Sequence, residues 1–558
     1  MQPPSTERAT ALVDELIGCG LTDVVLCPGS RSAPLAYAVL AAERAGRVRL
    51  HVRVDERSAG FLALGLAKVS RVPAAVVTTS GTAVANLHPA VLEAHHAGVP
   101  LIVLSADRPR ALRWTGANQT TVQPGMFAGA VRLECDLDDA AAADLGGWRA
   151  AARDAYDAAT GRGGYPGPAH INAPFAEPLV PELTADPPAA DLSPRGPAPS
   201  PVGEAPGGPD LGLPERTVVV VGDLPEPGQA ARAIAWAAGL GLPAVAEPFG
   251  DHPRPGALAH GVLVLDLPGF VDALAPECVV VVGRPTLSRP VTALVNRPDI
   301  DLVVVTAGAG WRSPAHPEAP VHPFGETVVP RPGRGPGPWA RRWLDAGTAV
   351  ERVLATEGAP LGSGTELVRA LLAALPDRAL LFLGSSKTVR DVDAGMAPRT
   401  RPLTVVASRG LAGIDGVVST AIGVALSAPE RPAYALLGDL TFVHDANGLL
   451  VGPDEARPDL TVIVVNDDGG GIFTILEPGD PARSDGFERV FGTSTGTDIG
   501  ALCRAHGVRH DVVAGPEELA SAVTAPPSGM RVVEVRADRS RHRADQEALR
   551  RIAARAAG

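Results

Sequence analysis

Two short segments in the last third of the chain place oxygen ligands on turns that follow apolar runs. The first is Gly438-Asp439-Leu440, directly after residues 433–437. The second is the Asn-Asp-Asp-Gly-Gly-Gly run 466–471, directly after residues 460–465. Both apolar runs read as buried strands, and ligands of open parallel sheets bind at the carboxyl ends of strands. We therefore expect one shared site, in which carboxylate and carbonyl oxygens hold a Mg²⁺ ion and a diphosphate group.

A simpler interpretation of the first motif stays open. Gly-Asp after a strand commonly does no more than cap the next helix, and Asp439 alone would fit that role. The three glycines 469–471 favour a ligand site, because they leave no side chains in the way of a ligand. Hard oxygen ligands do not distinguish Mg²⁺ from Mn²⁺.

Composition restricts the class of protein. The chain has 558 residues, 45% of them hydrophobic, and a formal charge of −12. That length predicts two or three domains, and the negative charge argues against nucleic acid or an anionic membrane as a partner. Five scattered cysteines without metal-ligand spacing suggest a reducing compartment. With no signal peptide and no apolar run that could span a bilayer, we expect a cytoplasmic protein without membrane insertion.

Strand, polar turn and helix alternate through most of the chain. This pattern predicts an α/β protein built of doubly wound parallel sheets. Dense Pro and Gly without periodicity marks two linkers between the blocks. The expected strands are 23–27, 49–54, 74–79, 101–104, 216–223, 278–282, 302–306, 380–383, 403–407, 433–437 and 460–465, and the expected organisation is a first domain 1–180, a linker 181–214, a central domain 215–330, a linker 331–345 and a third domain 346–558.

The paired motifs and the three-domain order resemble the thiamine-diphosphate enzymes. The resemblance implies that the first domain binds the pyrimidine end of the cofactor and the third binds its diphosphate and metal. Aligned on the Gly-Gly-x-Ile-Phe stretch, the metal ligands become Asp439, Asp467 and the carbonyl of Gly469. Asn466 stays open as an alternative to Asp467. The family further implies a homodimer or homotetramer whose active sites lie across a subunit interface.

Glu56 is the candidate cofactor activator. It follows the strand 49–54 and precedes the apolar run 59–62. A carboxylic acid that shares a proton with the cofactor's pyrimidine ring needs a water-poor setting, which this position offers. The alternative is a helix N-terminal Glu stabilised by the helix dipole. The diphosphate motif in the third domain favours the activator.

Further segments narrow the resemblance to one family of thiamine-diphosphate enzymes, the 2-succinyl-5-enolpyruvyl-6-hydroxy-3-cyclohexene-1-carboxylate synthases (MenD). The resemblance covers nearly the whole chain and is weakest in the central domain. The segments that carry it are CPGSRSAPL (27–35), DERSAGF (55–61), TSGTA (79–83), SADRP (105–109), GANQT (116–120) and SRGLAGIDG (408–416).

This family resemblance implies a reaction and a set of contacts. 2-Oxoglutarate loses CO₂, and the succinyl-semialdehyde carbanion adds to the ring alkene of isochorismate. The implied catalytic residues are Glu56, Ser386, Arg390 and Arg409; the implied cofactor contacts are Glu56, Ser80, Gly81, Ser386, Ile414, Gly438, Asp439, Leu440, Asp467 and Ile472; the implied substrate contacts are Ser30, Arg31, Ser32, Arg108, Asn118, Gln119, Arg289, Arg390, Arg409 and Phe473.

The arginines support this substrate class from the residues themselves. Arg31, Arg108, Arg390 and Arg409 each follow an apolar strand closely, and Arg289 is a weaker fifth candidate. Guanidinium groups pair bidentately with carboxylates, and both substrates carry several. Any one of these arginines could instead be an ordinary surface residue, and Ile414 an ordinary core residue. We leave His88, His95, His96 and His444 as structural residues, since they lack metal-ligand spacing.

Two other functions compete with this one. An acetolactate-synthase-like or decarboxylase relative would share Glu56 and the metal motif but has no need of an arginine-rich pocket. A non-catalytic ligand-binding relative would be expected to lose Glu56 or Asp439, and both are present.

Overall fold

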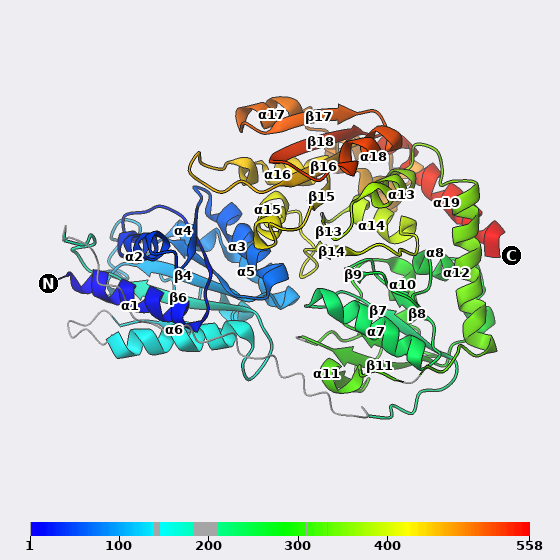
Figure 1. The fold of residues 1–558 in the computed structure, drawn as a ribbon, viewed down its shortest axis with the longest axis horizontal. Coiled ribbons are helices and arrows are strands. Elements are labelled where there is room, and N and C mark those ends of the chain that lie inside the picture. The colour runs from blue at the N-terminus through cyan, green and yellow to red at the C-terminus, as the bar shows by residue number, and fades with distance from the viewer. Residues whose placement is uncertain (1, 139–144, 183–208, 309, 332, 558) are drawn as a thin grey trace. The chain divides into compact units, whose positions relative to one another are not determined.

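The computed structural model describes residues 2–138, 145–182, 209–308, 310–331 and 333–557, and it contains three sheets with helices packed on them (Figure 1). The predicted α/β class with parallel-dominated sheets is confirmed. The chain divides into two compact units. The first unit comprises Met1–Ser200, Gly410–Pro429 and His444–Pro458, and the second comprises Pro201–Arg409, Glu430–Val443 and Asp459–Gly558.

The sheet of the first unit has six strands in the order β2-β1-β3-β4-β6-β5, and its pairings are parallel. Its central strands are mostly apolar and are buried along their whole length, as expected of strands covered on both faces. The strands are β1 (Asp23–Leu26), β2 (Arg49–Val52), β3 (Ala74–Thr78), β4 (Leu101–Asp107), β5 (Leu133–Asp136) and β6 (Pro168–Pro174); the helices are α1 (Pro4–Cys19), α2 (Ala33–Arg44), α3 (Glu56–Ser70), α4 (Thr82–Ala85), α5 (His88–Ala97), α6 (Leu145–Thr160) and α15 (Val417–Ser427).

Helix α15 comes from the predicted third domain, yet it packs against α3 within the first unit. Glycines let the two helices approach closely. A Cβ on Gly65 would lie 2.2 Å from the carbonyl oxygen of Thr420, and a Cβ on Gly423 would lie 2.3 Å from that of Leu62. These two positions have no room for a side chain. Because α15 belongs to the first unit, the predicted third domain contributes residues to both compact units.

The second unit contains a five-stranded parallel sheet in the order β12-β11-β10-β7-β8. Valine dominates its centre, and β10 is buried along its whole length. Its strands are β7 (Thr217–Val221), β8 (Ala244–Ala246), β10 (Cys278–Val282), β11 (Asp301–Thr306) and β12 (Val321–Pro323); the helices of this part of the chain are α7 (Pro227–Gly239), α8 (Gly261–Leu265), α9 (Phe270–Leu274), α10 (Arg289–Val295), α11 (Phe324–Thr327) and α12 (Pro338–Thr356).

The second unit also contains a seven-stranded sheet in the order β17-β18-β16-β15-β13-β14-β9. All its strands run parallel except β9, which pairs antiparallel with β14. β9 comes from the predicted central domain, so that segment completes the edge of a neighbouring sheet. The strands are β9 (Gly250–His252), β13 (Ala379–Leu383), β14 (Leu403–Ala407), β15 (Ala433–Gly438), β16 (Leu460–Asn466), β17 (Arg509–Val513) and β18 (Met530–Arg536); the helices are α13 (Gly364–Ala374), α14 (Lys387–Gly395), α16 (Asp439–His444), α17 (Ile499–Ala505), α18 (Pro516–Thr524) and α19 (His542–Ala557).

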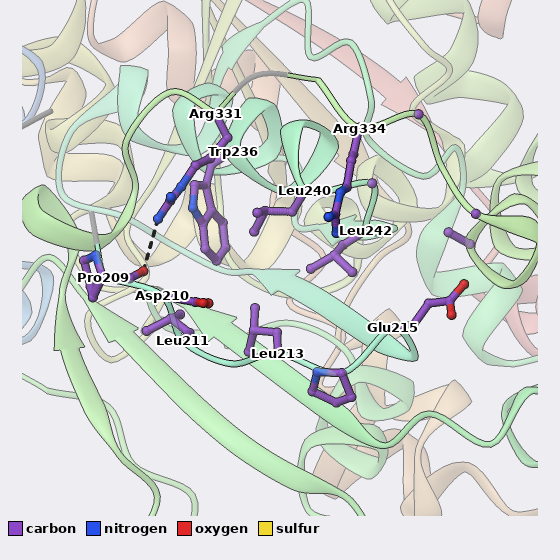
Figure 2. Close-up of a pocket in the computed structure, with 15 residues that line it drawn as sticks. Pro209, Asp210, Leu211, Leu213, Glu215, Trp236, Leu240, Leu242, Arg331 and Arg334 are labelled. Atoms are coloured by element: carbon purple, nitrogen blue, oxygen red, sulfur yellow. Dashed lines mark hydrogen bonds between the residues drawn. The ribbon is translucent and has the colours of Figure 1, made fainter. Parts of the chain in front are cut away.

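The predicted linkers are only partly visible. Most of 181–214 lies outside the described residues, and α12 begins at Pro338, inside the predicted linker 331–345. The described residues at the end of the first linker and in the second linker flank a cavity of about 420 Å³ beside α7 (Figure 2). Trp236 lines it, and Arg331 closes one side by donating to the carbonyl oxygen of Pro209 at 3.1 Å. The residues predicted for catalysis do not line this cavity.

Within the described ranges, none of the helices combines the length and the apolar character that a membrane crossing requires.

Candidate functional site

The two oxygen-rich motifs lie at one edge of the seven-stranded sheet. Strands β15 and β16 are parallel neighbours, and their register sets Gly438 beside Val465. Asp439 opens α16 directly after β15, and Asp467 follows the last residue of β16. The structure therefore brings the two motifs together at the carboxyl ends of adjacent strands, as expected.

Asp439 is a buried carboxylate with no ion pair to Lys, Arg or His in the described part of the chain. It is 6% exposed and accepts hydrogen bonds from the backbone N–H groups of Leu440 and Gly469. Burial, reinforced by the negative charge of Asp467, raises the pKa of Asp439. A divalent cation would relieve the repulsion between these two carboxylates. The pair of carboxylates thus fits a Mg²⁺ or Mn²⁺ ion.

Asp467 is oriented by a histidine from the last helix. Its Oδ2 lies 2.7 Å from Nε2 of His542, and both side chains are largely buried. The neighbouring Asn466 serves the fold, because its amide donates to Glu534 at 2.9 Å and its Oδ1 accepts from the N–H of Asp468 at 3.0 Å. These contacts favour Asp467 over Asn466 as a metal ligand. His542 was not among the predicted site residues, and it lies 75 residues from Asp467.

The glycine run that follows is needed for a close backbone approach. Gly469 has a φ of 141°, and a Cβ there would lie 2.0 Å from the carbonyl oxygen of Gly492. Gly470 donates its N–H to that same oxygen at 2.7 Å. Ile472 and Phe473 come next and are half-buried, with the Phe473 ring 5.6 Å from that of Phe491. The turn thus leads directly from the carboxylates to an apolar segment.

Two predicted substrate arginines, Arg390 and Arg409, form a cationic pair in the second unit. Nη1 of Arg390 donates to the carbonyl oxygen of Ser386 at 2.6 Å, and Ser386 itself has a strained φ of 100°. Burial and the charge of Arg409 both lower the pKa of Arg390. Arg409 is 3% exposed and donates through Nε and Nη2 to Thr286, at 3.0 and 2.8 Å. Neutral oxygens thus accept the hydrogen bonds of both guanidinium groups, and Asp393 offsets part of their charge.

Arg289 differs from this pair. Its side chain is 68% exposed and makes a bidentate ion pair with Glu477, at 2.7 and 2.9 Å. Its charge does contribute to the lowered pKa of Arg390, so it lies in the same electrostatic neighbourhood. A substrate carboxylate would have to compete with Glu477 for this arginine.

Glu56 belongs to the first unit and begins α3. Asp55 caps the helix by accepting from the N–H of Ser58, and Glu56 is half-buried with its Oε2 3.3 Å from Nδ2 of Asn86. Helix capping is therefore carried out by Asp55, which leaves the Glu56 carboxylate for another role. Ile414, predicted to contact the cofactor, lies half-buried in the loop before α15 in the same unit.

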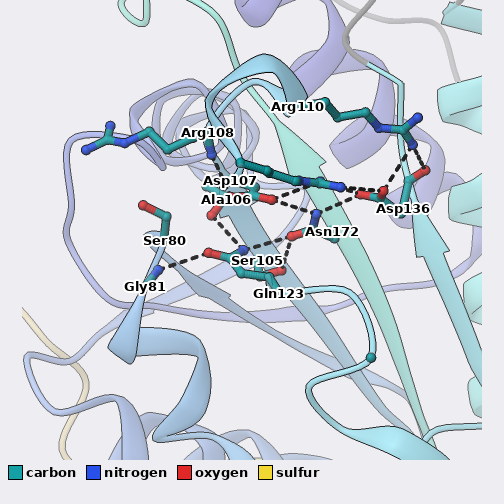
Figure 3. Close-up of polar contacts among 12 residues, drawn as sticks. Ser80, Gly81, Ser105, Ala106, Asp107, Arg108, Arg110, Gln123, Asp136 and Asn172 are labelled. Carbon is teal, nitrogen blue, oxygen red and sulfur yellow. Dashed lines mark hydrogen bonds and ion pairs between the residues drawn. The ribbon is translucent and has the colours of Figure 1, made fainter. Parts of the chain in front are cut away.

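A buried polar network connects the turn at Gly81 with the loop that carries Arg108 (Figure 3). Gln123 accepts from the N–H of Gly81 at 2.9 Å and donates to Oδ1 of Asn172 at 2.8 Å. Asn172 donates to Asp107 at 3.0 Å, and Asp107 accepts from the N–H of Arg108 at 2.7 Å. Gln123 and Asn172 were not predicted as site residues, because their partners lie on other strands and loops.

The other predicted substrate residues of the first unit cluster around Arg108. Its guanidinium donates to the carbonyl oxygen of Asn118 at 3.0 Å. Gln119 and Ser80 exchange reciprocal hydrogen bonds of 3.0 and 2.9 Å, so a predicted substrate residue and a predicted cofactor residue are directly linked. Within this unit, the link therefore joins the predicted substrate contacts to the predicted cofactor contacts.

Arg31 is buried beside this cluster. Its Nη1 donates to the carbonyl oxygen of Phe175 at 2.7 Å, and burial together with the charge of Arg108 lowers its pKa. Of the flanking serines, Ser30 is exposed, whereas Ser32 is buried and donates to the carbonyl oxygen of Gly29 at 3.0 Å. Ser32 therefore stabilises the turn that holds Arg31.

Family models match both ends of the chain. The model described as "Thiamine pyrophosphate enzyme, N-terminal TPP binding domain" matches residues 6–126, and "Thiamine pyrophosphate enzyme, C-terminal TPP binding domain" matches residues 392–535. Thiamine pyrophosphate is another name for thiamine diphosphate. The first range includes Glu56, and the second includes Asp439 and Asp467.

Similar proteins extend this finding to the full length. The 2-succinyl-5-enolpyruvyl-6-hydroxy-3-cyclohexene-1-carboxylate synthase of Kineococcus radiotolerans is 49% identical, covering 99% of this chain and 98% of the relative. The protein of the same name from Saccharopolyspora erythraea is 47% identical, covering 98% of each. Among solved structures, benzoylformate decarboxylase from Polynucleobacter necessarius aligns with a TM-score of 0.66 at 18% identity, covering 95% of this chain and 98% of that one. This last likeness concerns the fold alone.

Proposed function

The chain belongs to the 2-succinyl-5-enolpyruvyl-6-hydroxy-3-cyclohexene-1-carboxylate synthase family of thiamine-diphosphate enzymes, and we propose that it is the transferase that joins 2-oxoglutarate to isochorismate with loss of CO₂ in menaquinone biosynthesis. The structural observation that carries the substrate class is the pair formed by the half-buried Arg390 and the buried Arg409, in the same unit as Asp439 and Asp467. Two guanidinium groups held by neutral oxygens suit a substrate with two carboxylates.

The metal end of the site would be held by the second unit. Asp439, Asp467 and the carbonyl of Gly469 would bind Mg²⁺ or Mn²⁺, with Gly438, Leu440, Ile472 and Ser386 beside the cofactor. The bound cofactor would supply the carbanion chemistry that a 2-oxo acid needs to lose CO₂. The half-buried Ile472 and Phe473 would exclude water from the reacting atoms.

The first unit would bind the other end of the cofactor and the second substrate. Glu56 would share a proton with the pyrimidine nitrogen N1′, while Ser80, Gly81 and Ile414 would contact the cofactor. The remaining predicted contacts would hold the carboxylates and hydroxyl groups of isochorismate. These are Ser30, Arg31, Ser32, Arg108, Asn118 and Gln119, with Arg289 as a further contact from the second unit.

We also propose that the enzyme is a homodimer or homotetramer in which Glu56 of one protomer serves the metal site of another. Complementation tests this. Homo-oligomers of Glu56→Gln and of Asp439→Ala should each be inactive. When the two variants are co-expressed, activity should return in those size-exclusion fractions whose mass, determined by light scattering, is that of a dimer or larger. Activity that never returns on mixing would contradict a shared site.

The free state of all five cysteines supports the proposed cytoplasmic location.

The reaction itself is tested with purified protein, the cofactor and Mg²⁺. We expect CO₂ release from 2-oxoglutarate that depends on isochorismate, and one product containing carbon from both. Turnover of pyruvate or benzoylformate, with isochorismate ignored, would favour another thiamine-diphosphate enzyme. Cofactor binding without turnover of any 2-oxo acid would favour a non-catalytic relative.

A further inference from the structure

Glu247 is a buried acid outside the set of predicted site residues. It follows β8, is 5% exposed, and accepts through Oε1 from the backbone N–H groups of Thr286 and Leu287 at 2.6 and 2.7 Å. Its Oε2 lies 3.5 Å from Oγ1 of Thr286. One carboxyl group therefore holds the loop between β10 and α10 at two consecutive amides.

The same loop orients a predicted substrate arginine. Thr286 accepts from Nε of Arg409 through its Oγ1 and from Nη2 through its carbonyl oxygen. The guanidinium also lies over the ring of Phe249, 5.8 Å from its centroid. With these two nitrogens bound to Thr286, Nη1 and the second N–H of Nη2 are the groups that would meet a ligand.

We infer that Glu247 is a positioning residue, which fixes Thr286 so that Arg409 is held ready for a carboxylate of the 2-oxo acid. This inference rests on the proposed function, in which Arg409 binds the substrate. A long side chain such as arginine loses substantial rotamer freedom when it is ordered. Holding the guanidinium in advance removes this loss from the binding step. Glu247 thus acts on substrate affinity without touching substrate.

Glutamine provides a matched conservative variant at this position. Its carbonyl oxygen can accept from both backbone N–H groups, and its amide group can face Oγ1 of Thr286. Burial, with a contribution from the charge of Asp393, raises the pKa of Glu247 to about 8. The raised pKa favours the uncharged form of the carboxyl group, which glutamine reproduces.

The test compares four variants by steady-state kinetics with 2-oxoglutarate and isochorismate. Glu247→Ala should raise the KM for 2-oxoglutarate about tenfold, change kcat much less, and leave the affinity for thiamine diphosphate and Mg²⁺ unaltered. Glu247→Gln should stay within about twofold of wild type. Thr286→Val, which replaces the Oγ1 hydroxyl with a methyl group, should raise the same KM by a smaller factor. Glu277→Ala, an exposed glutamate before β10, is the control and should change nothing.

The outcomes separate the inference from the proposed function. If wild type does not consume 2-oxoglutarate, the proposed function is wrong. If wild type does and Glu247→Ala keeps its KM, or if Glu247→Gln is as impaired as the alanine variant, the inference is wrong. If Glu247→Ala does not fold, an unchanged KM in Thr286→Val overturns it. Hydrogen exchange provides a measurement that does not depend on activity. The exchange rates of the Thr286 and Leu287 amides should rise in the Glu247→Ala variant and stay unchanged in Glu247→Gln.

Discussion

Two buried aspartates at the carboxyl ends of strands have opposite electrostatic surroundings. Asp107 ends β4 in the first unit, where Arg113 lies 2.9 Å from its Oδ2 and Asn172 donates at 3.0 Å. Asp439 follows β15 in the second unit, where it has backbone donors and faces the carboxylate of Asp467. Position in the sheet is therefore not enough to identify a functional carboxylate. A buried charge whose own fold neutralises it stabilises that fold, whereas one left unneutralised is suited to an external cation.

The largest expected effect comes from removing the unneutralised carboxylate. Asp439→Ala should lower activity by about a thousandfold or more, because a carboxylate ligand of the metal is lost. Calorimetry should show that Mg²⁺-dependent binding of thiamine diphosphate disappears. In wild type, cofactor plus Mg²⁺ should raise the melting temperature by ligand binding, and the variant should not respond. Asp454→Ala, an exposed aspartate of the first unit, is the control. Retained Mg²⁺-dependent binding would remove Asp439 from the metal site.

Glu56→Gln tests whether a carboxylate that does not cap its helix is also functional. We expect kcat to fall by roughly 10²–10⁴-fold, the range of a lost proton-transfer group, with cofactor affinity largely kept. Steady-state kinetics and a cofactor titration measure the two quantities. Asp55→Asn is the matched control, because it keeps a helix-capping side chain. Unchanged turnover in Glu56→Gln would assign Glu56 to the helix alone.

Asp107→Ala should act on stability. The substitution leaves Arg113 and Asn172 with one acceptor fewer in a buried site, and we expect a loss of about 3 kcal/mol in the free energy of unfolding. Denaturant titration measures it. Asp439→Ala in metal-free buffer should lose far less, because it removes a repulsion. Equal destabilisation by the two substitutions would contradict the comparison.

Asp23 adds a third buried aspartate, with a smaller and pH-dependent effect. Burial raises its pKa, but hydrogen bonds from His51 and Arg49 on the neighbouring β2 outweigh this and bring the pKa down to about 2. The stabilisation is present above pH ~4 and is lost as the pH falls towards 2, with a size of roughly 2 kcal/mol. The destabilisation caused by Asp23→Asn should therefore shrink between pH 6 and pH 2. A penalty independent of pH would show that the carboxylate charge contributes nothing.

The three-residue strand β9 was not among the strands predicted from the sequence. Its residues, Gly250 to His252, have no apolar alternation, and its pairing partner lies about 150 residues further along the chain. The predicted third domain, 346–558, includes α15, which packs against α3 in the first unit. That helix is placed by glycine contacts with α3, and contacts between distant segments leave no local periodicity.

The sequence by itself determined the α/β class, the central strands and the placement of Asp439 beside Asp467. Buried parallel strands are continuous apolar runs, and their carboxyl ends share an edge, so both follow from local patterns. Only the tertiary structure decided which groups neutralise or orient each functional side chain. His542 lies 75 residues from Asp467, Thr286 lies 123 residues from Arg409, and Asn172 lies 65 residues from Asp107. Such partners meet through packing between elements, so the electrostatic state of each candidate residue depends on the fold as a whole.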